Sequence, residues 1–132
     1  MGNVWLVLGS LSGALAVGMG AFGAHGLENI LEANQQTDVY QTAAEYHFVH
    51  SLALLAVGLL ALRVPSKSAN VAGWSFLLGI LLFSGSLYAL GITNFTKLGA
   101  IAPFGGTAFI VGWIALALAG WKKPEHEPMR PE

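Results

Sequence analysis

Four long apolar segments separated by short polar loops dominate the hydrophobic and polar pattern of the chain. The segments lie at residues 4–24, 38–62, 69–92 and 103–121. Each is close to the ~20 residues that an α-helix needs to cross a hydrocarbon core of ~30 Å. The pattern predicts an all-α integral membrane protein, a four-helix transmembrane bundle with short loops. We expect one membrane domain over residues 1–122 and a flexible cytoplasmic tail over the charged, proline-containing residues 123–132.

The second segment differs from the other three because its first half is polar. The run YQTAAEYHFVHS (Tyr40–Ser51) leads directly into LALLAVGLLAL, which has no polar side chain. Ionisable groups at membrane depth are costly, so they indicate a functional site by default. At 100° per residue, one helix face collects Tyr40, Ala43, Ala44, His47, His50, Ser51 and Leu54.

The two histidines of this segment are three residues apart, whereas its carboxylate points elsewhere. His47 and His50 can therefore approach the same ligand or water. Glu45 lies two residues from His47 and projects from roughly the opposite side of the helix. Its partner must come from another helix, a loop, a second subunit or the lipid headgroups. We expect the helix to begin near Thr37 or Asp38, either of which can serve as its N-cap.

Composition supports the membrane class and excludes several functions. The 132 residues are 55% hydrophobic and 10% charged, against about 25% charged in a typical soluble domain. A net charge of −1 lacks the basic face that nucleic acids require. The absence of cysteine excludes disulfides and thiolate metal sites. No Lys or Arg precedes the first apolar segment, so we interpret it as a retained span rather than a signal peptide.

The distribution of basic residues predicts the orientation in the membrane. Five Lys or Arg residues lie in the loop after span two and in the tail, and only Lys97 lies in the opposite loops. By the positive-inside rule, both termini are expected in the cytoplasm. The polar half of span two then opens toward the outer leaflet. Near the span ends, four tryptophans are expected to act as interface anchors: Trp5, Trp74, Trp113 and Trp121.

Small residues mark the expected contacts between helices. Small residues at four-residue spacing let helix backbones approach closely in lipid. The candidate packing positions are Gly9, Gly13, Gly20, Gly23, Gly85, Gly105 and Gly106. An alternative for the glycine pair after Pro103 is a broken helix that lines a cavity, as in transporters.

Four motifs resemble a family of small membrane proteins. They are GAFGAHGL (Gly20–Leu27), Tyr46-His47 with His50, LFSGSLYAL (Leu82–Leu90) and PFGGTAFIVGW (Pro103–Trp113). Together they resemble the YgdD/YwdK-like inner-membrane proteins, grouped as domain of unknown function 423. The resemblance implies a four-helix protein of the inner (plasma) membrane and brings no established activity. Its family-defining positions would be His25, His47, His50, Ser84, Ser86, Pro103, Gly105 and Gly106.

The candidate polar site near the outer leaflet combines side chains from several segments. Its members are His25, Glu45, Tyr46, His47, His50, Ser84 and Ser86. Three imidazoles and a carboxylate suit a proton, a polar headgroup or a metal ion, and His25 opposite span two can also complete a haem site. The structural alternative is that the histidines bind Ser84, Ser86, Thr107 or Tyr88 across the bundle, and that Glu45 pairs with Lys97.

The sequence predicts a non-enzymatic accessory subunit or binding module. No Ser-His-Asp arrangement or second buried carboxylate supports an enzyme. The alternatives are a small transporter or proton-conducting element that uses Glu45, His47 and His50, and a metal- or haem-binding redox component. The expected partners are the lipid bilayer and either further copies of the chain or a larger membrane complex.

Overall fold

The computed structural model describes residues 1–121, and that part of the chain is helical apart from short turns. Its elements are α1 (Gly2–His25), α2 (Glu28–Asn34), α3 (Thr37–Arg63), α4 (Lys67–Gly79), the π-helical η1 (Ile80–Ser84), α5 (Gly85–Thr93), the 3₁₀-helical η2 (Thr96–Ala100) and α6 (Ala102–Trp121). The predicted all-α class is confirmed. The predicted tail at residues 123–132 lies outside the described residues.

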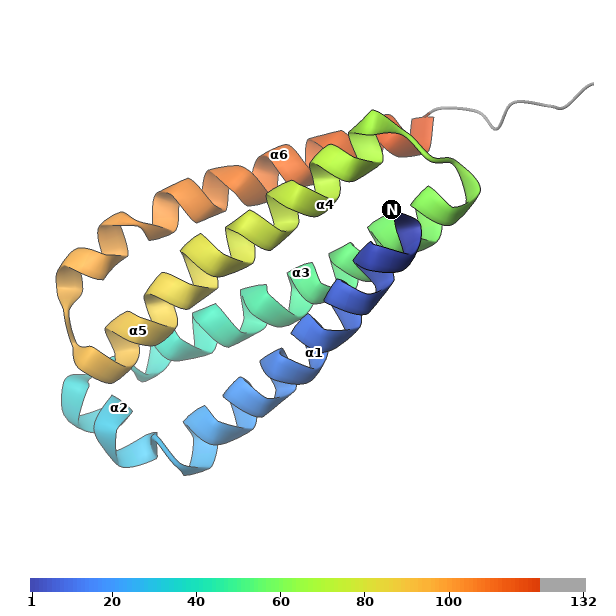
Figure 1. Cartoon of the computed structure of the whole chain (residues 1–132). Coiled ribbons are helices and arrows are strands. Elements are labelled where there is room, and N and C mark those ends of the chain that lie inside the picture. The colour runs from blue at the N-terminus through green and yellow to red at the C-terminus, as the bar shows by residue number, and fades with distance from the viewer. Residues whose placement is uncertain (122–132) are drawn as a thin grey trace, which may run out of the picture.

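Four helical segments of the described chain are long and apolar enough to cross a membrane. They are Gly2–His25, Thr37–Arg63, Lys67–Thr93 and Thr96–Trp121, and the third contains α4, η1 and α5 as one continuous helix. The second begins at Thr37, with Gln36 rather than Thr37 or Asp38 at the N-cap. Figure 1 shows the four rods side by side, with Met1 and the end of α6 at the same end of the bundle.

The bundle consists of two helix pairs, α1 with α3 and α4 with α6. α1 packs chiefly on α3, α4 packs on α6, and α3 joins the two pairs through contacts with α4, η1 and α5 (Figure 1). The short α2 closes the end opposite Met1. Leu31 of α2 is buried, and Asn34 donates its amide hydrogens to the carbonyl oxygens of Gly91 and Ile92 at 3.0 and 3.1 Å. The short helix between the first two spans is thus tied to the end of the third span.

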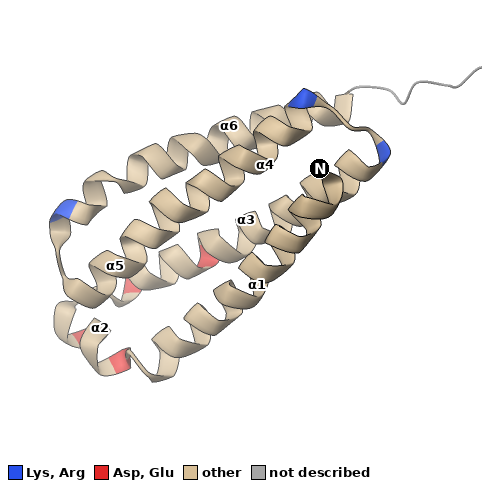
Figure 2. Cartoon of the chain, in the orientation of Figure 1, with Lys and Arg blue, Asp and Glu red and all other residues tan. Residues whose placement is uncertain are grey.

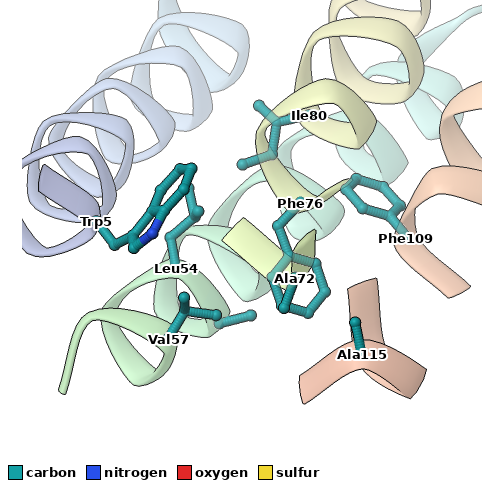
Figure 3. Packing of buried hydrophobic residues seen from close by; sticks show 9 residues of the cluster. Trp5, Leu54, Val57, Ala72, Phe76, Ile80, Phe109 and Ala115 are labelled. Atoms are coloured by element: carbon teal, nitrogen blue, oxygen red, sulfur yellow. The ribbon is translucent and has the colours of Figure 1, made fainter. Parts of the chain in front are cut away.

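The main apolar core lies between the two pairs, toward the end that carries Met1. Figure 3 shows Trp5 of α1 beside Leu54 of α3, while Phe76 of α4 and Phe109 of α6 fill the other side. The prediction of Trp5 as an interface anchor is wrong, because the side chain is fully buried. Its indole N–H donates to Asn70 Oδ1 at 3.1 Å, which satisfies the polar edge inside the core.

Several of the predicted packing glycines bring helices of the same chain together. A Cβ at Gly9 would lie 2.9 Å from the backbone nitrogen of Leu55, and one at Gly23 would overlap the ring of Tyr40. These two glycines therefore allow α1 to approach α3. By contrast, a Cβ at Gly13 would meet nothing closer than 3.9 Å, and one at Gly20 nothing within 4 Å. Association between copies of the chain through Gly13 and Gly20 stays a prediction.

The third span contains one π-helical turn that fits against α6. The amide of Gly85 bonds to the carbonyl oxygen of Ile80, five residues back. A Cβ at Gly105 would overlap the backbone of Phe83, so α6 crosses η1 at closest approach here. α6 is continuous from Ala102 to Trp121, so the alternative of a helix broken at the glycine pair is wrong. π-helical turns inside α-helices occur frequently at functional sites.

Candidate functional site

α3 places the polar side chains of the second span on two different sides. His47 and His50 are buried toward the other helices, at 3% and 4% exposure. Glu45 and Tyr46 are exposed on the outside of the helix. This division follows the helical period, because residues at positions i and i+3 project to neighbouring directions and those at i and i+2 do not.

His47 connects α3 to α1 and to α5 through hydrogen bonds at both ring nitrogens. Its Nδ1 lies 3.0 Å from the hydroxyl oxygen of Tyr88 in α5. Its Nε2 lies 3.2 Å from Oγ of Ser12 in α1. Ser12 Oγ lies 2.6 Å from Oγ of Ser51, whose hydroxyl donates to the carbonyl oxygen of His47 at 2.7 Å. We call these four residues the His47 loop, because the bonds through Ser12 and Ser51 return to His47, and Tyr88 is attached to the loop at Nδ1.

The directions of the hydrogen bonds in the His47 loop follow from the bond between the Ser51 hydroxyl and the carbonyl oxygen of His47. Ser51 uses its single hydrogen on a carbonyl, so it accepts the hydrogen of Ser12. Ser12 in turn has no hydrogen left for His47, so it accepts from Nε2–H. A neutral imidazole carries one hydrogen, so Nδ1 accepts from the Tyr88 hydroxyl. Of the two neutral forms of His47, the loop therefore favours the Nε2–H tautomer.

His50 is held in the opposite tautomer by α3 itself and by α6. Its Nδ1 lies 2.6 Å from the carbonyl oxygen of Tyr46, which can only accept. Its Nε2 accepts the indole N–H of Trp113 at 3.1 Å. The ring of Phe109 stacks on the imidazole with 3.5 Å between centroids and 8° between planes. Both nitrogens and one face of His50 are thus occupied by the chain.

The candidate residues do not form the shared metal or haem site considered from the sequence. His47 binds groups of α1 and α5 whereas His50 binds α6, so the expectation of one ligand for both rings is wrong. His25 is exposed at the end of α1. Within residues 1–121, no three His, Asp or Glu side chains are placed to hold a metal ion. With both nitrogens of each buried ring engaged, the residues do not fit a metal or haem iron.

The proposed hydrogen-bond partners across the bundle were correct only in part. Tyr88 binds His47 as expected. Ser86 instead donates to the carbonyl oxygen of Phe83 at 3.0 Å, and Thr107 donates to that of Pro103 at 2.9 Å. Ser84 is fully buried, and its hydroxyl has no hydrogen-bond partner among the described residues. Nothing in the sequence singled out Ser12 or Trp113 as a hydrogen-bond partner of an imidazole.

A groove of about 670 Å³ runs along the outside of α3 and α6. We call it the α3–α6 groove. Its lining residues come from α3, η1 and α6: Glu45, Tyr46, Val49, His50, Phe83, Pro103, Gly106, Thr107, Phe109, Ile110 and Trp113. Two of the candidate residues, Glu45 and Tyr46, therefore have free surface in a cavity, while the imidazole of His50 forms part of its wall. Phe83, Phe109 and Trp113 were not expected there.

Glu45 does not form the ion pair with Lys97 that was considered from the sequence. Residues 1–121 contain no pair of oppositely charged side chains within 4.0 Å. In Figure 2, all four acidic residues of this part lie on α2 and the adjoining half of α3. Arg63 and Lys67 lie at the opposite end of the bundle. Glu45 also lines a neighbouring pocket of about 390 Å³ together with Glu28 and Glu32.

Comparison with known sequences places the chain in one family. Residues 19–106 match the family described as "Protein of unknown function (DUF423)". The chain belongs to this family. It is 46% identical to the UPF0382 membrane protein YwdK of Bacillus subtilis over 121 residues, which cover 91% of this chain and 98% of that one. The resemblance drawn from the four motifs is therefore confirmed.

Further DUF423-related sequences come from other bacteria. A UPF0382 membrane protein of Haemophilus influenzae is 48% identical over 122 residues, 92% of this chain and 97% of that one. One from Staphylococcus saprophyticus is 46% identical over 120 residues, 91% of this chain and 98% of that one. No solved structure matches the chain. With these names and its four apolar spans, the protein is a multi-pass membrane protein of a family whose function is not known.

Proposed function

We propose that the protein is a non-enzymatic binding module of the cytoplasmic membrane, which holds an amphiphilic small molecule in the α3–α6 groove. The observation that carries this proposal is the mixed lining of one cavity. Glu45 contributes a carboxylate at one end, and Phe83, Phe109, Ile110 and Trp113 contribute apolar surface along the rest. Binding sites for small molecules are typically apolar clefts with a few placed polar groups.

The depth of the groove in the bilayer suits an amphiphile. Glu45 precedes Arg63 by 18 residues, or about 27 Å at ~1.5 Å per residue. This places the carboxylate near one boundary of a ~30 Å hydrocarbon core when Arg63 marks the other. From Pro103 to Trp113 the groove continues along α6 for about 15 Å toward the interior. A polar head at Glu45 and an apolar body along α6 match this gradient.

The hydrogen bonds of the two buried histidines favour a binding function over catalysis or proton transfer. A general base needs a ring nitrogen that can reach a substrate, and those of His47 and His50 are bonded within the bundle. The His47 loop returns to its own starting residue through a backbone carbonyl. It therefore provides no continuous path from one membrane face to the other, which weakens the proton-conducting alternative.

The charge distribution supports an orientation with both termini in the cytoplasm. Met1, Arg63, Lys67 and the end of α6 share one end of the bundle, and the acidic residues lie at the other (Figure 2). Since the chain has no cysteine, a single one can report the side. In intact cells, a membrane-impermeant maleimide should label Glu28→Cys and leave Lys67→Cys unlabelled until the cells are opened. The reverse pattern would show the opposite orientation.

Filling the groove tests the binding function. A Cβ at Gly106 would meet only Phe83, at 3.9 Å, and Gly106 lines the groove, so we expect the longer side chain of Gly106→Leu to occupy the groove while the bundle stays folded. Gly120→Leu is the matched control on the same helix, because nothing lies within 4 Å of a Cβ there. Native mass spectrometry of protein purified from its own membrane should show a bound small molecule on wild type and Gly120→Leu and none on Gly106→Leu. No bound molecule on wild type, or equal occupancy in all three, contradicts the proposal.

A further inference from the structure

The aromatic side chains of the α3–α6 groove form one connected cluster beside the carboxylate. The ring centroid of Tyr46 lies 4.6 Å from that of Phe83 and 6.1 Å from that of Phe109. Tyr46 and Trp113 remain 43% and 45% exposed, so part of each ring is available to a bound molecule. The negative faces of aromatic rings attract cations within about 6 Å of the centroid.

Among the residues that line the groove, the charge has one sign. Glu45 is exposed, and neither Lys nor Arg is among the residues that line the groove. Glu28 and Glu32 lie around the neighbouring pocket that shares Glu45. At the edge of the hydrocarbon core the dielectric constant is lower than in water, so an unpaired carboxylate attracts a cation more strongly than it would at a fully hydrated surface. An anionic headgroup would be repelled.

An organic ammonium ion combines the properties that this lining recognises. Its charge pairs with a carboxylate, and its alkyl substituents keep it weakly hydrated against aromatic surface. Aromatic residues are the usual protein environment for quaternary ammonium groups. A small inorganic cation would instead need several oxygen ligands, which this groove does not supply from its aromatic walls.

We propose that the ligand of the α3–α6 groove is a lipophilic organic ammonium ion, with its cationic head between Glu45 and the ring of Tyr46 and its apolar body along Phe83, Phe109 and Trp113. This inference rests on the proposed binding function and names its ligand class. It assigns different tasks to the two ends of the groove. The carboxylate end selects the charge, and the α6 end, which Gly106 leaves open, accepts any apolar chain of suitable width.

A pair of probes that differ only in charge tests the ligand class. Dodecyltrimethylammonium carries the cation, and its carbon isostere, with a tert-butyl group in place of the trimethylammonium group, has the same shape without charge. Affinities would be measured by native mass spectrometric titration in dodecyl maltoside micelles. We expect wild type to bind the ammonium probe about tenfold more tightly than the isostere, as the sum of one partly exposed ion pair and one cation–π contact.

Two substitutions remove the proposed cation-binding groups without filling the groove. Glu45→Gln keeps the shape of the side chain, and Tyr46→Leu keeps an apolar residue. Both side chains are exposed, so neither change removes a packed core group. Each should lower the affinity for the ammonium probe by about threefold or more relative to the affinity for the isostere. Gly106→Leu should abolish binding of both probes, and the control Gly120→Leu should abolish neither.

The outcomes distinguish this inference from the proposed function. If wild type binds both probes equally and Gly106→Leu still blocks both, the ammonium assignment is overturned while the groove remains a binding site. If Glu45→Gln and Tyr46→Leu weaken the two probes to the same extent, the assignment is likewise overturned. If Gly106→Leu binds both probes as well as Gly120→Leu does, or if wild type binds neither probe, both the ligand class and the groove are wrong.

Discussion

The three tyrosines of the chain allow one chemical change to be compared in three environments. Tyr88 is 7% exposed and donates its hydroxyl hydrogen to His47 Nδ1. Tyr40 is 2% exposed and donates to the carbonyl oxygen of Met19 at 2.7 Å. Tyr46 is 43% exposed, and its hydroxyl forms no hydrogen bond with another described residue. Replacing each by phenylalanine removes one oxygen and keeps the ring.

The structure sets different costs for these changes. Tyr88→Phe leaves Nδ1 of a buried imidazole without a partner, which costs about 1–3 kcal/mol in soluble proteins. Hydrogen bonds between membrane helices contribute less, ~0.6 kcal/mol on average and ~1.7 at most. We therefore expect Tyr88→Phe and Tyr40→Phe each to lower the free energy of unfolding by about 1 kcal/mol, roughly a fivefold change in the equilibrium constant. Tyr46→Phe should stay within ~0.5 kcal/mol of wild type.

Equilibrium unfolding in mixed micelles of dodecyl maltoside and sodium dodecyl sulfate, followed by circular dichroism, measures these differences. Tyr46→Phe serves as the control for the change itself. If Tyr88→Phe unfolds at the same detergent composition as Tyr46→Phe, the bond to His47 does not hold α5 against α3. The Nε2–H tautomer of His47 would then lack the hydrogen bond that favours it.

Two further pairs of variants test the contacts of α6 in the same unfolding assay. Gly105→Ala should lower the free energy of unfolding by about 1–3 kcal/mol, because the methyl group overlaps the backbone of η1. Gly106→Ala has room for the methyl group and should stay within ~0.5 kcal/mol of wild type. Equal effects would show that α6 does not approach η1 there. Trp113→Phe removes the donor to His50 Nε2 and should cost about 1 kcal/mol, whereas Trp121→Phe, at 88% exposure, should cost almost nothing. A similar cost for both tryptophans would argue against the indole–imidazole bond.

The arrangement within each helix could be predicted from the sequence. Hydropathy alone located the four spans, because ~20 apolar residues are needed to cross the bilayer. The helical period then placed His47, His50 and Leu54 on the buried side of α3 and Glu45 on the outside, as the structure has them. Within one regular helix, the direction of each side chain relative to its neighbours depends only on its position.

The partners of the imidazoles could not be predicted, because they depend on how each helix is rotated relative to the others. The other three spans are apolar around their whole circumference, so no amphipathic pattern shows which side faces α3. Ser12 and Trp113 each carry one polar group within an apolar segment, and nothing around them in the sequence indicates a bond to a histidine. The π-helical turn at Ile80–Ser84 also changes which residues of the third span project toward α3, and nothing in its sequence ILLFS marks it.

The α3–α6 groove was missed for a related reason. Its carboxylate was recognised as unusual, but the aromatic walls come from η1 and α6, far away in the sequence. Phe83 and Phe109 resemble any other lipid-facing residue until the helices are assembled. Their meeting with Tyr46 depends on the close approach that Gly105 permits between α6 and η1.

The most direct test of the whole account is the protonation of the two buried histidines. We expect both imidazoles to be neutral parts of the bundle, which leaves Glu45 as the group that meets a ligand. Nitrogen-15 NMR of histidine-labelled protein in lipid nanodiscs distinguishes the two tautomers and the charged form; replacing the other two histidines by glutamine leaves only these signals. The predicted spectrum at neutral pH shows His47 protonated at Nε2 and His50 protonated at Nδ1. A charged ring at either position, or the same tautomer at both, would contradict the structure proposed for the site.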